Sequence, residues 1–234
     1  MSLPQLNSSP KYSMTIPSSQ VDVKFRPYLV KEEKVLLMAL ETQDVKTALG
    51  AVVDTITSCV EGKIQPEDLT TFDVEYMFTQ IRSKSSGETS EVLLSCSGCG
   101  HQNEISIPLD QLCVDVPKAN SFIELTGDIS LELKYPSYAE IIQYDIENID
   151  KSSSVFDLAA SCIKSIITEE ERIDSRECSK EQLVEFLESM TTQQFKGISD
   201  FMAAIPKLQH DVEFKCSECE EHNKQTIEGM QNFF

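Results

Sequence analysis

The sequence has no tryptophan, only three histidines and little positive charge. Its 234 residues hold 20 Lys and Arg against 39 Asp and Glu, a formal net charge of −19. Nucleic acids and anionic membranes both attract clustered Lys and Arg, so neither is expected as a partner. No unbroken apolar run approaches the ~18 residues of a membrane span. The first twenty residues lack the regions of a signal peptide, so we expect a protein that stays in the cytoplasm where it is made.

The common catalytic motifs are missing as well. The sequence contains no P-loop, no dinucleotide-binding glycine motif, no His-Glu-x-x-His and no Gly-x-Ser-x-Gly. With three histidines in the chain, a nucleophilic cysteine has few candidate bases. A hydrolase that relies on carboxylates stays open, but the sequence predicts a protein that is not an enzyme.

Cysteine, in contrast, is present in a repeated arrangement. Cys96 and Cys99 form one Cys-x-x-Cys pair, and Cys216 and Cys219 form another. The two segments read VLLSCSGCGHQNEISI and VEFKCSECEEHNKQTI, with Asn four residues after the second cysteine in both. A two-residue gap lets both thiolates of a tight turn point at one ion, and tetrahedral Zn²⁺ needs four ligands. The sequence therefore predicts a structural zinc ribbon built from two hairpins.

Other interpretations of the two pairs stay open. They could be metal-free thiols, a redox pair, or ligands of a different metal. A thioredoxin-type pair would lie between a strand and a helix, which neither segment resembles. His101 and His222 lie near the cysteines at different offsets, and with four cysteines present we expect them not to be ligands. The 116 residues between Cys99 and Cys216 would form a domain inserted into the ribbon, or a domain that the ribbon clips shut.

Hydrophobic periodicity predicts an α+β fold: a mainly helical domain, a small antiparallel β part and the split four-cysteine ribbon. Asp44 and a capping box from Ser179 to Gln182 indicate two helix starts. The acid-rich stretch 169–188 is interpreted as a solvated loop and helix face. Helices are expected over residues 28–43, 44–60, 71–82, 153–168, 180–190 and 192–205, and from Pro136 onward. Strands are expected at residues 21–27 and in a hairpin of 122–125 and 129–133.

Changes of composition along the chain divide it into five parts. They are an extended N-terminal arm (1–20), an N-terminal helical region (21–90), the zinc ribbon (91–110 and 211–228), an inserted β-hairpin plus helical domain (111–210) and a C-terminal tail (229–234).

Two segments ahead of the first cysteine pair resemble a known family. FRPYLVKEEKVLLMALETQD begins at Phe25 and LTTFDVEYMFTQIRSKSSGE begins at Leu69. Over about residues 24–104 the chain is similar to the hub-associated baseplate subunits of T-even-type contractile-tailed phages. The resemblance implies a structural or assembly role in the central hub or inner baseplate. It also implies other baseplate or hub proteins as partners, oligomerisation within the baseplate as an open question, assembly in the host cytoplasm and a place in the virion tail.

Five residues are interface candidates under this interpretation: Arg26, Lys31, Arg82, Phe233 and Phe234. Arg82 is favoured because arginine is enriched at protein interfaces. The two terminal aromatics either pack on the protein's own core or anchor a partner. The alternative function is a zinc-ribbon adaptor or regulator that binds nucleic acid or another protein, although acidic residues flank the second cysteine pair.

Overall fold

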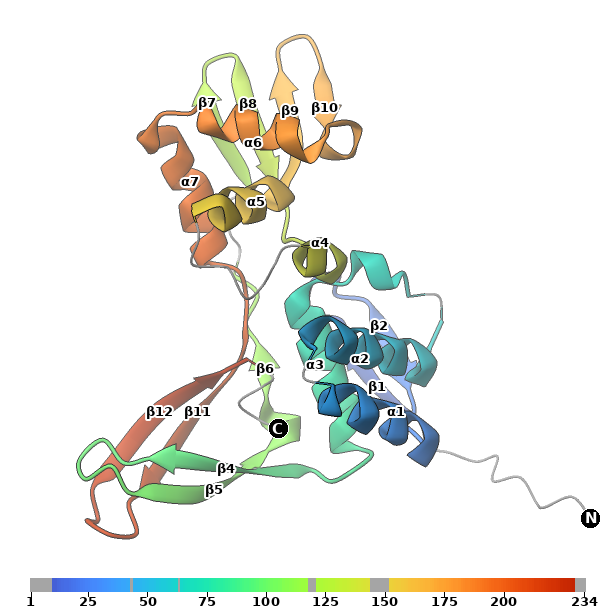
Figure 1. Cartoon of the computed structure of the whole chain (residues 1–234), viewed down its shortest axis with the longest axis vertical. Coiled ribbons are helices and arrows are strands. Elements are labelled where there is room, and N and C mark those ends of the chain that lie inside the picture. The colour runs from blue at the N-terminus through green and yellow to red at the C-terminus, as the bar shows by residue number, and fades with distance from the viewer. Residues whose placement is uncertain (1–9, 43, 63, 118–120, 144–151, 230–234) are drawn as a thin grey trace, which may run out of the picture. The chain divides into compact units, whose positions relative to one another are not determined.

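The computed structural model describes residues 10–42, 44–62, 64–117, 121–143 and 152–229. The chain forms two compact units. Unit 1 comprises residues 1–66, 72–115 and 207–234, and unit 2 comprises residues 67–71 and 116–206. Figure 1 shows helices and several small antiparallel sheets, which confirms the α+β class. Every helix in the described ranges is too short or too polar to span a lipid bilayer.

The described residues in the helical part of unit 1 form three α-helices and one small sheet. The helices are α1 (Val30–Glu41), α2 (Val45–Cys59) and α3 (Thr71–Ser83). The antiparallel sheet has the order β1 (Tyr12–Thr15), β2 (Asp22–Phe25) and β3 (Val60–Glu61). Asp44 caps α2 as expected, because its carboxylate accepts the backbone N–H of Thr47 at 2.9 Å. Phe25, Ile56, Met77 and Ile81 are fully buried in this part.

Two sequence expectations for this part differ from the structure. Residues 10–20 were expected to belong to an extended arm, but Tyr12–Thr15 pair with Asp22–Phe25. The turn between them is held by Asp73 of α3, whose carboxylate accepts the backbone N–H and the hydroxyl of Ser18 at 2.9 and 2.6 Å. The apolar residues of α1 were expected to face a core. Only Leu36 and Ala39 are buried, while Leu37 and Leu40 are 57% and 61% exposed.

The ribbon part of unit 1 consists of two hairpins. One is β4 (Thr89–Ser95) with β5 (Gln102–Pro108), and the other is β11 (Leu208–Lys215) with β12 (His222–Glu228). The short strand β6 (Cys113–Val114) pairs with the start of β11. A short 3₁₀ turn, Leu109–Gln111, connects β5 to β6. Buried side chains along the hairpins and in the turn after β5 form one apolar cluster: Ile107, Leu109, Leu112, Leu208, Val212, Phe214 and Ile227.

Unit 2 is a four-stranded antiparallel sheet with helices over it (Figure 1). The sheet order is β10 (Arg172–Asp174), β9 (Ile163–Thr168), β8 (Ile129–Leu133) and β7 (Phe122–Thr126). The helices are α4 (Tyr138–Gln143), α5 (Ser152–Cys162), α6 (Lys180–Glu188) and α7 (Thr192–Ala203). The β7–β8 hairpin and the capping box from Ser179 to Gln182 are confirmed. The core combines residues of β8, β9, α5, α6 and α7.

One helix prediction in unit 2 is wrong in its second half. Residues 153–168 were expected to be a single helix, but the helix ends at Cys162 and Ile163–Thr168 form strand β9. Three isoleucines and a threonine crowd this segment, and β-branched residues favour a strand. The segment also pairs on both sides, with β8 and with β10, and sequence periodicity does not show such long-range pairing. The acid-rich stretch likewise contains a strand, β10.

Candidate metal centre

Two six-residue turns at the tips of the ribbon hairpins carry the four paired cysteines. We call residues 96–101 the first knuckle and residues 216–221 the second knuckle. Each is closed by the strand pair that flanks it, Ser95 with Gln102 and Lys215 with His222. In the first, the N–H of Cys96 donates to the carbonyl of His101 at 2.8 Å; in the second, Cys216 donates to Glu221 at 2.9 Å. The two knuckles therefore have the same backbone design.

The equivalence extends to an unusual backbone conformation. The fifth residue of each knuckle has a positive φ, +74° at Gly100 and +60° at Glu220. Its N–H donates to the carbonyl of the first cysteine, at 2.9 Å for Gly100 and 3.1 Å for Glu220. This turn places the two sulfurs of each knuckle on one side of the chain.

The four sulfurs converge on a single point between the hairpins. The Sγ atoms of Cys96, Cys99, Cys216 and Cys219 all lie within 4.8 Å of one another. Sγ of Cys96 is 3.6 Å from Sγ of Cys219, and Sγ of Cys99 is 3.7 Å from that of Cys216. A tetrahedral ion with metal–sulfur bonds of about 2.3 Å needs sulfurs about 3.8 Å apart. The ligand geometry thus fits one tetrahedral ion.

Hydrogen bonds and neighbouring thiols shift the pKa values of the clustered cysteines in opposite directions. The backbone N–H of Cys99 and the amide of Asn223 lower the pKa of Cys96 to about 6. The backbone N–H of Cys219 lowers the pKa of Cys216 in the same way. At Cys219 the backbone N–H of Glu221 lowers the pKa, but the neighbouring thiols, Cys99 first among them, raise it to about 12. Four thiolates this close repel one another unless a positive ion lies between them.

Two asparagines complete the cluster, and each reaches across to the opposite hairpin. The side-chain oxygen of Asn103 accepts the backbone N–H of Ser217 at 2.9 Å and its hydroxyl at 3.0 Å. The side-chain oxygen of Asn223 accepts the same two groups of Ser97, both at 2.8 Å. The sequence repeats an Asn four residues after each second cysteine, but a partner more than a hundred residues away was not foreseen.

Four protein ligands around one ion are typical of structural rather than catalytic zinc centres. His101 and His222 are not among the clustered residues. Within the described parts of the chain, no second group of three or more His, Cys, Asp or Glu lies close enough to hold an ion.

The interface candidates lie in different surroundings. Arg26 forms a two-pronged ion pair with Glu32, at 3.0 and 2.8 Å, and its guanidinium also donates to the carbonyl of Ser58 at 3.0 Å. The hydrogen bonds from Arg26 to Glu32 lower the pKa of Glu32. Through its contacts with Glu32 and Ser58, Arg26 ties the start of α1 to the end of α2. The side chain of Lys31 is 74% exposed. Phe233 and Phe234 lie outside the described residues.

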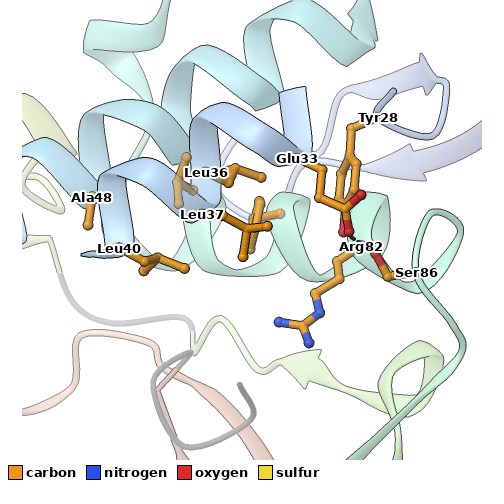
Figure 2. A pocket seen from close by; sticks show the side chains of 10 residues that line it. Tyr28, Glu33, Leu36, Leu37, Leu40, Ala48, Arg82 and Ser86 are labelled. Atoms are coloured by element: carbon orange, nitrogen blue, oxygen red, sulfur yellow. Dashed lines mark hydrogen bonds between the residues drawn. The ribbon is translucent and has the colours of Figure 1, made fainter. Parts of the chain in front are cut away.

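Arg82 lies at an apolar groove of about 450 Å³ in unit 1. Figure 2 shows Leu36, Leu37 and Leu40 of α1 along the groove, and Arg82 with Tyr28 and Glu33 at one end. Burial lowers the pKa of Arg82, while Tyr28 and Glu33 act in the opposite direction. We name this surface the α1 groove. Sequence reasoning placed its leucines in a core and so did not predict it.

These features define a class of protein: a scaffold in which two distant hairpins meet at four cysteine sulfurs, with a second folded unit between them in the sequence. The comparison with known families is more specific. Residues 9–234 match the family described as T4 bacteriophage base plate protein, and the chain belongs to this family. No curated protein and no solved structure matches the chain. Family membership implies a structural role in the virion tail among other baseplate proteins.

Proposed function

We propose that this baseplate protein is a non-enzymatic subunit of the central hub region, stabilised by one structural Zn²⁺ bound to Cys96, Cys99, Cys216 and Cys219. The observation that carries the zinc proposal is the convergence of four thiols, two from each hairpin, within 4.8 Å. Zn²⁺ is favoured because a tetrahedral all-sulfur set is typical of structural zinc sites. The hub assignment depends on the resemblance over about residues 24–104, and assembly in the host cytoplasm follows from the same source.

Elemental analysis of the purified protein tests the zinc proposal. We expect about one Zn per chain, and about none in a variant with Cys96→Ser and Cys216→Ser. A matched control is Cys59→Ser with Cys162→Ser, since both residues are buried thiols outside the cluster. A wild-type sample that is folded without bound metal, and whose stability does not change when a chelator is added, would contradict the proposal.

We further propose that the α1 groove binds a hub-region protein. The groove offers leucine side chains together with the half-buried guanidinium of Arg82. Exposed apolar surface with an arginine inside it is typical of protein interfaces. The occupant that fits is a segment that inserts an apolar side chain and presents a carboxylate to Arg82. The net charge of −19 disfavours nucleic acid, the partner of the alternative adaptor function.

A pull-down with hub components tests the groove. Arg82→Glu and Leu40→Asp should each weaken capture at least ten-fold, because one reverses the charge and the other makes the apolar wall polar. Lys196→Glu, at an exposed position of α7 in unit 2, makes the same charge change elsewhere and should leave capture unchanged. If all three variants are captured as well as the wild-type protein, the proposal is wrong.

A further inference from the structure

We propose that Asn103 and Asn223 are positioning residues of the metal centre, and that each sets the ligand geometry of the opposite knuckle. The proposal rests on the metal site proposed above and deepens it. Asn103 follows the first knuckle and Asn223 follows the second, each at the second position of the outgoing strand, β5 or β12. Their contacts form two equivalent amide bridges across a gap of more than a hundred residues in the sequence.

The oxygen of each amide fixes the chain at the opposite first cysteine. Oδ1 of Asn103 accepts the N–H and the hydroxyl of Ser217, the residue after Cys216. Oδ1 of Asn223 accepts the same groups of Ser97, the residue after Cys96. Each bridge therefore hydrogen-bonds to the residue directly after a cysteine ligand. Loss of the bridge would free the backbone that fixes the position of that sulfur.

The nitrogen of each amide contacts the opposite sulfur itself. Nδ2 of Asn223 donates to Sγ of Cys96 at 3.4 Å, and Nδ2 of Asn103 donates to Sγ of Cys216 at 3.7 Å. The same nitrogens hold their own knuckles through the carbonyls of Glu221 and His101, at 3.0 and 3.1 Å. Ser N–H groups need an acceptor, while carbonyls and thiolates need a donor, so only one orientation of each amide satisfies all its contacts.

Burial separates the four ligands into two kinds. Asn103 and Asn223 are 6% and 5% exposed, and they contact the buried Cys96 and Cys216. Cys99 and Cys219 are exposed. Each knuckle thus contributes one buried sulfur that the amide of the opposite hairpin contacts and one exposed sulfur. A buried amide that loses these partners is costly, which makes the bridges a condition for closing the ribbon.

Titration of the full chain with Co²⁺, followed by competition with Zn²⁺, tests the inference, because thiolate-to-cobalt absorption reports ligand geometry. Asn103→Leu and Asn223→Leu keep the side-chain size and remove every contact. Each should weaken metal binding about 10- to 100-fold and reduce the tetrahedral cobalt bands, by similar amounts because the bridges are equivalent. Gln102→Leu and His222→Leu, at the exposed preceding positions, are matched controls and should change affinity less than about three-fold.

The outcomes separate the two proposals. A wild-type protein that binds one metal, with Asn variants inside the range of the controls, overturns the bridges and leaves the metal site intact. A wild-type protein that binds no metal overturns both. If the Leu variants cannot be saturated with metal, Ser97→Ala and Ser217→Ala decide, since each removes only a hydroxyl contact. Weakening of about three-fold or more in both supports the bridges, and unchanged affinity in both overturns them.

Discussion

The ribbon and unit 2 are both built around antiparallel strands, but different interactions hold them together. In unit 2, eleven buried residues from β8, β9 and three helices form one apolar core. The apolar cluster of the ribbon lies along its strands, while the knuckles bury only Cys96 and Cys216, and Asn103 and Asn223 are buried just after them. A two-stranded hairpin is only marginally stable by itself in water. Converging sulfurs and amide bridges take the place of a core at the knuckles.

Metal removal should produce the largest difference in local stability between the ribbon and unit 2. Structural zinc contributes apparent free energies of about 10–16 kcal/mol in small zinc domains, so a chelator should open the knuckles. We expect backbone amides of residues 96–101 and 216–221 to lose protection in hydrogen exchange. Amides of β8 and β9 should keep theirs, because no part of the four-cysteine cluster lies in unit 2. Equal loss in both regions would mean that the regions are not independent.

The converse change is Ile198→Ala in α7. Ile198 is fully buried in the core of unit 2. Truncation of a buried isoleucine costs about 2–5 kcal/mol, which chemical denaturation of unit 2 should measure. The content and affinity of bound metal should not change. Ser199→Ala, at the exposed next position, is the control and should stay within about 0.5 kcal/mol of wild type. If the metal affinity falls together with the stability of unit 2, the two regions are not stabilised independently.

A finer comparison concerns the fifth residue of each knuckle, Gly100 or Glu220. At φ near +60° a side chain costs about 1–2 kcal/mol, so Gly100→Ala should destabilise the first knuckle. No atom outside Gly100 and its two chain neighbours lies within 4 Å of the added Cβ, so this cost comes from the backbone conformation. Glu220→Gly should stabilise the second knuckle by about 1 kcal/mol, less a small loss from its exposed ion pair with Lys215. Resistance of the bound metal to a chelator measures both, and effects of the same sign would contradict this account.

The sequence predicted the features that depend on local spacing. The two Cys-x-x-Cys pairs identified both knuckles, and Asp44 and Ser179 identified two helix starts. Each of these signals lies within a few residues of its structural result. The Asn repeat was visible too, but its meaning depends on Ser97 and Ser217 in the opposite hairpin.

The features that were missed depend on distant partners. Ile163–Thr168 is a strand because β8 and β10 lie on either side of it. Tyr12–Thr15 is a strand because β2 and the carboxylate of Asp73 hold the intervening turn. The stripe on α1 has the periodicity of a buried face, yet Leu37 and Leu40 are exposed beside the α1 groove. Periodicity shows that a face is apolar and does not show what covers it.

The separation of the two knuckles has a consequence for timing during synthesis. Cys99 and its neighbour Cys216 are 117 positions apart. At about 5–20 residues per second, a ribosome needs roughly 6–23 s to make that stretch. During this interval the first knuckle exists with two sulfurs and with neither Asn223 nor Ser217 to support it. The site therefore closes only after unit 2 has been translated, and a chain that stops within unit 2 cannot complete it.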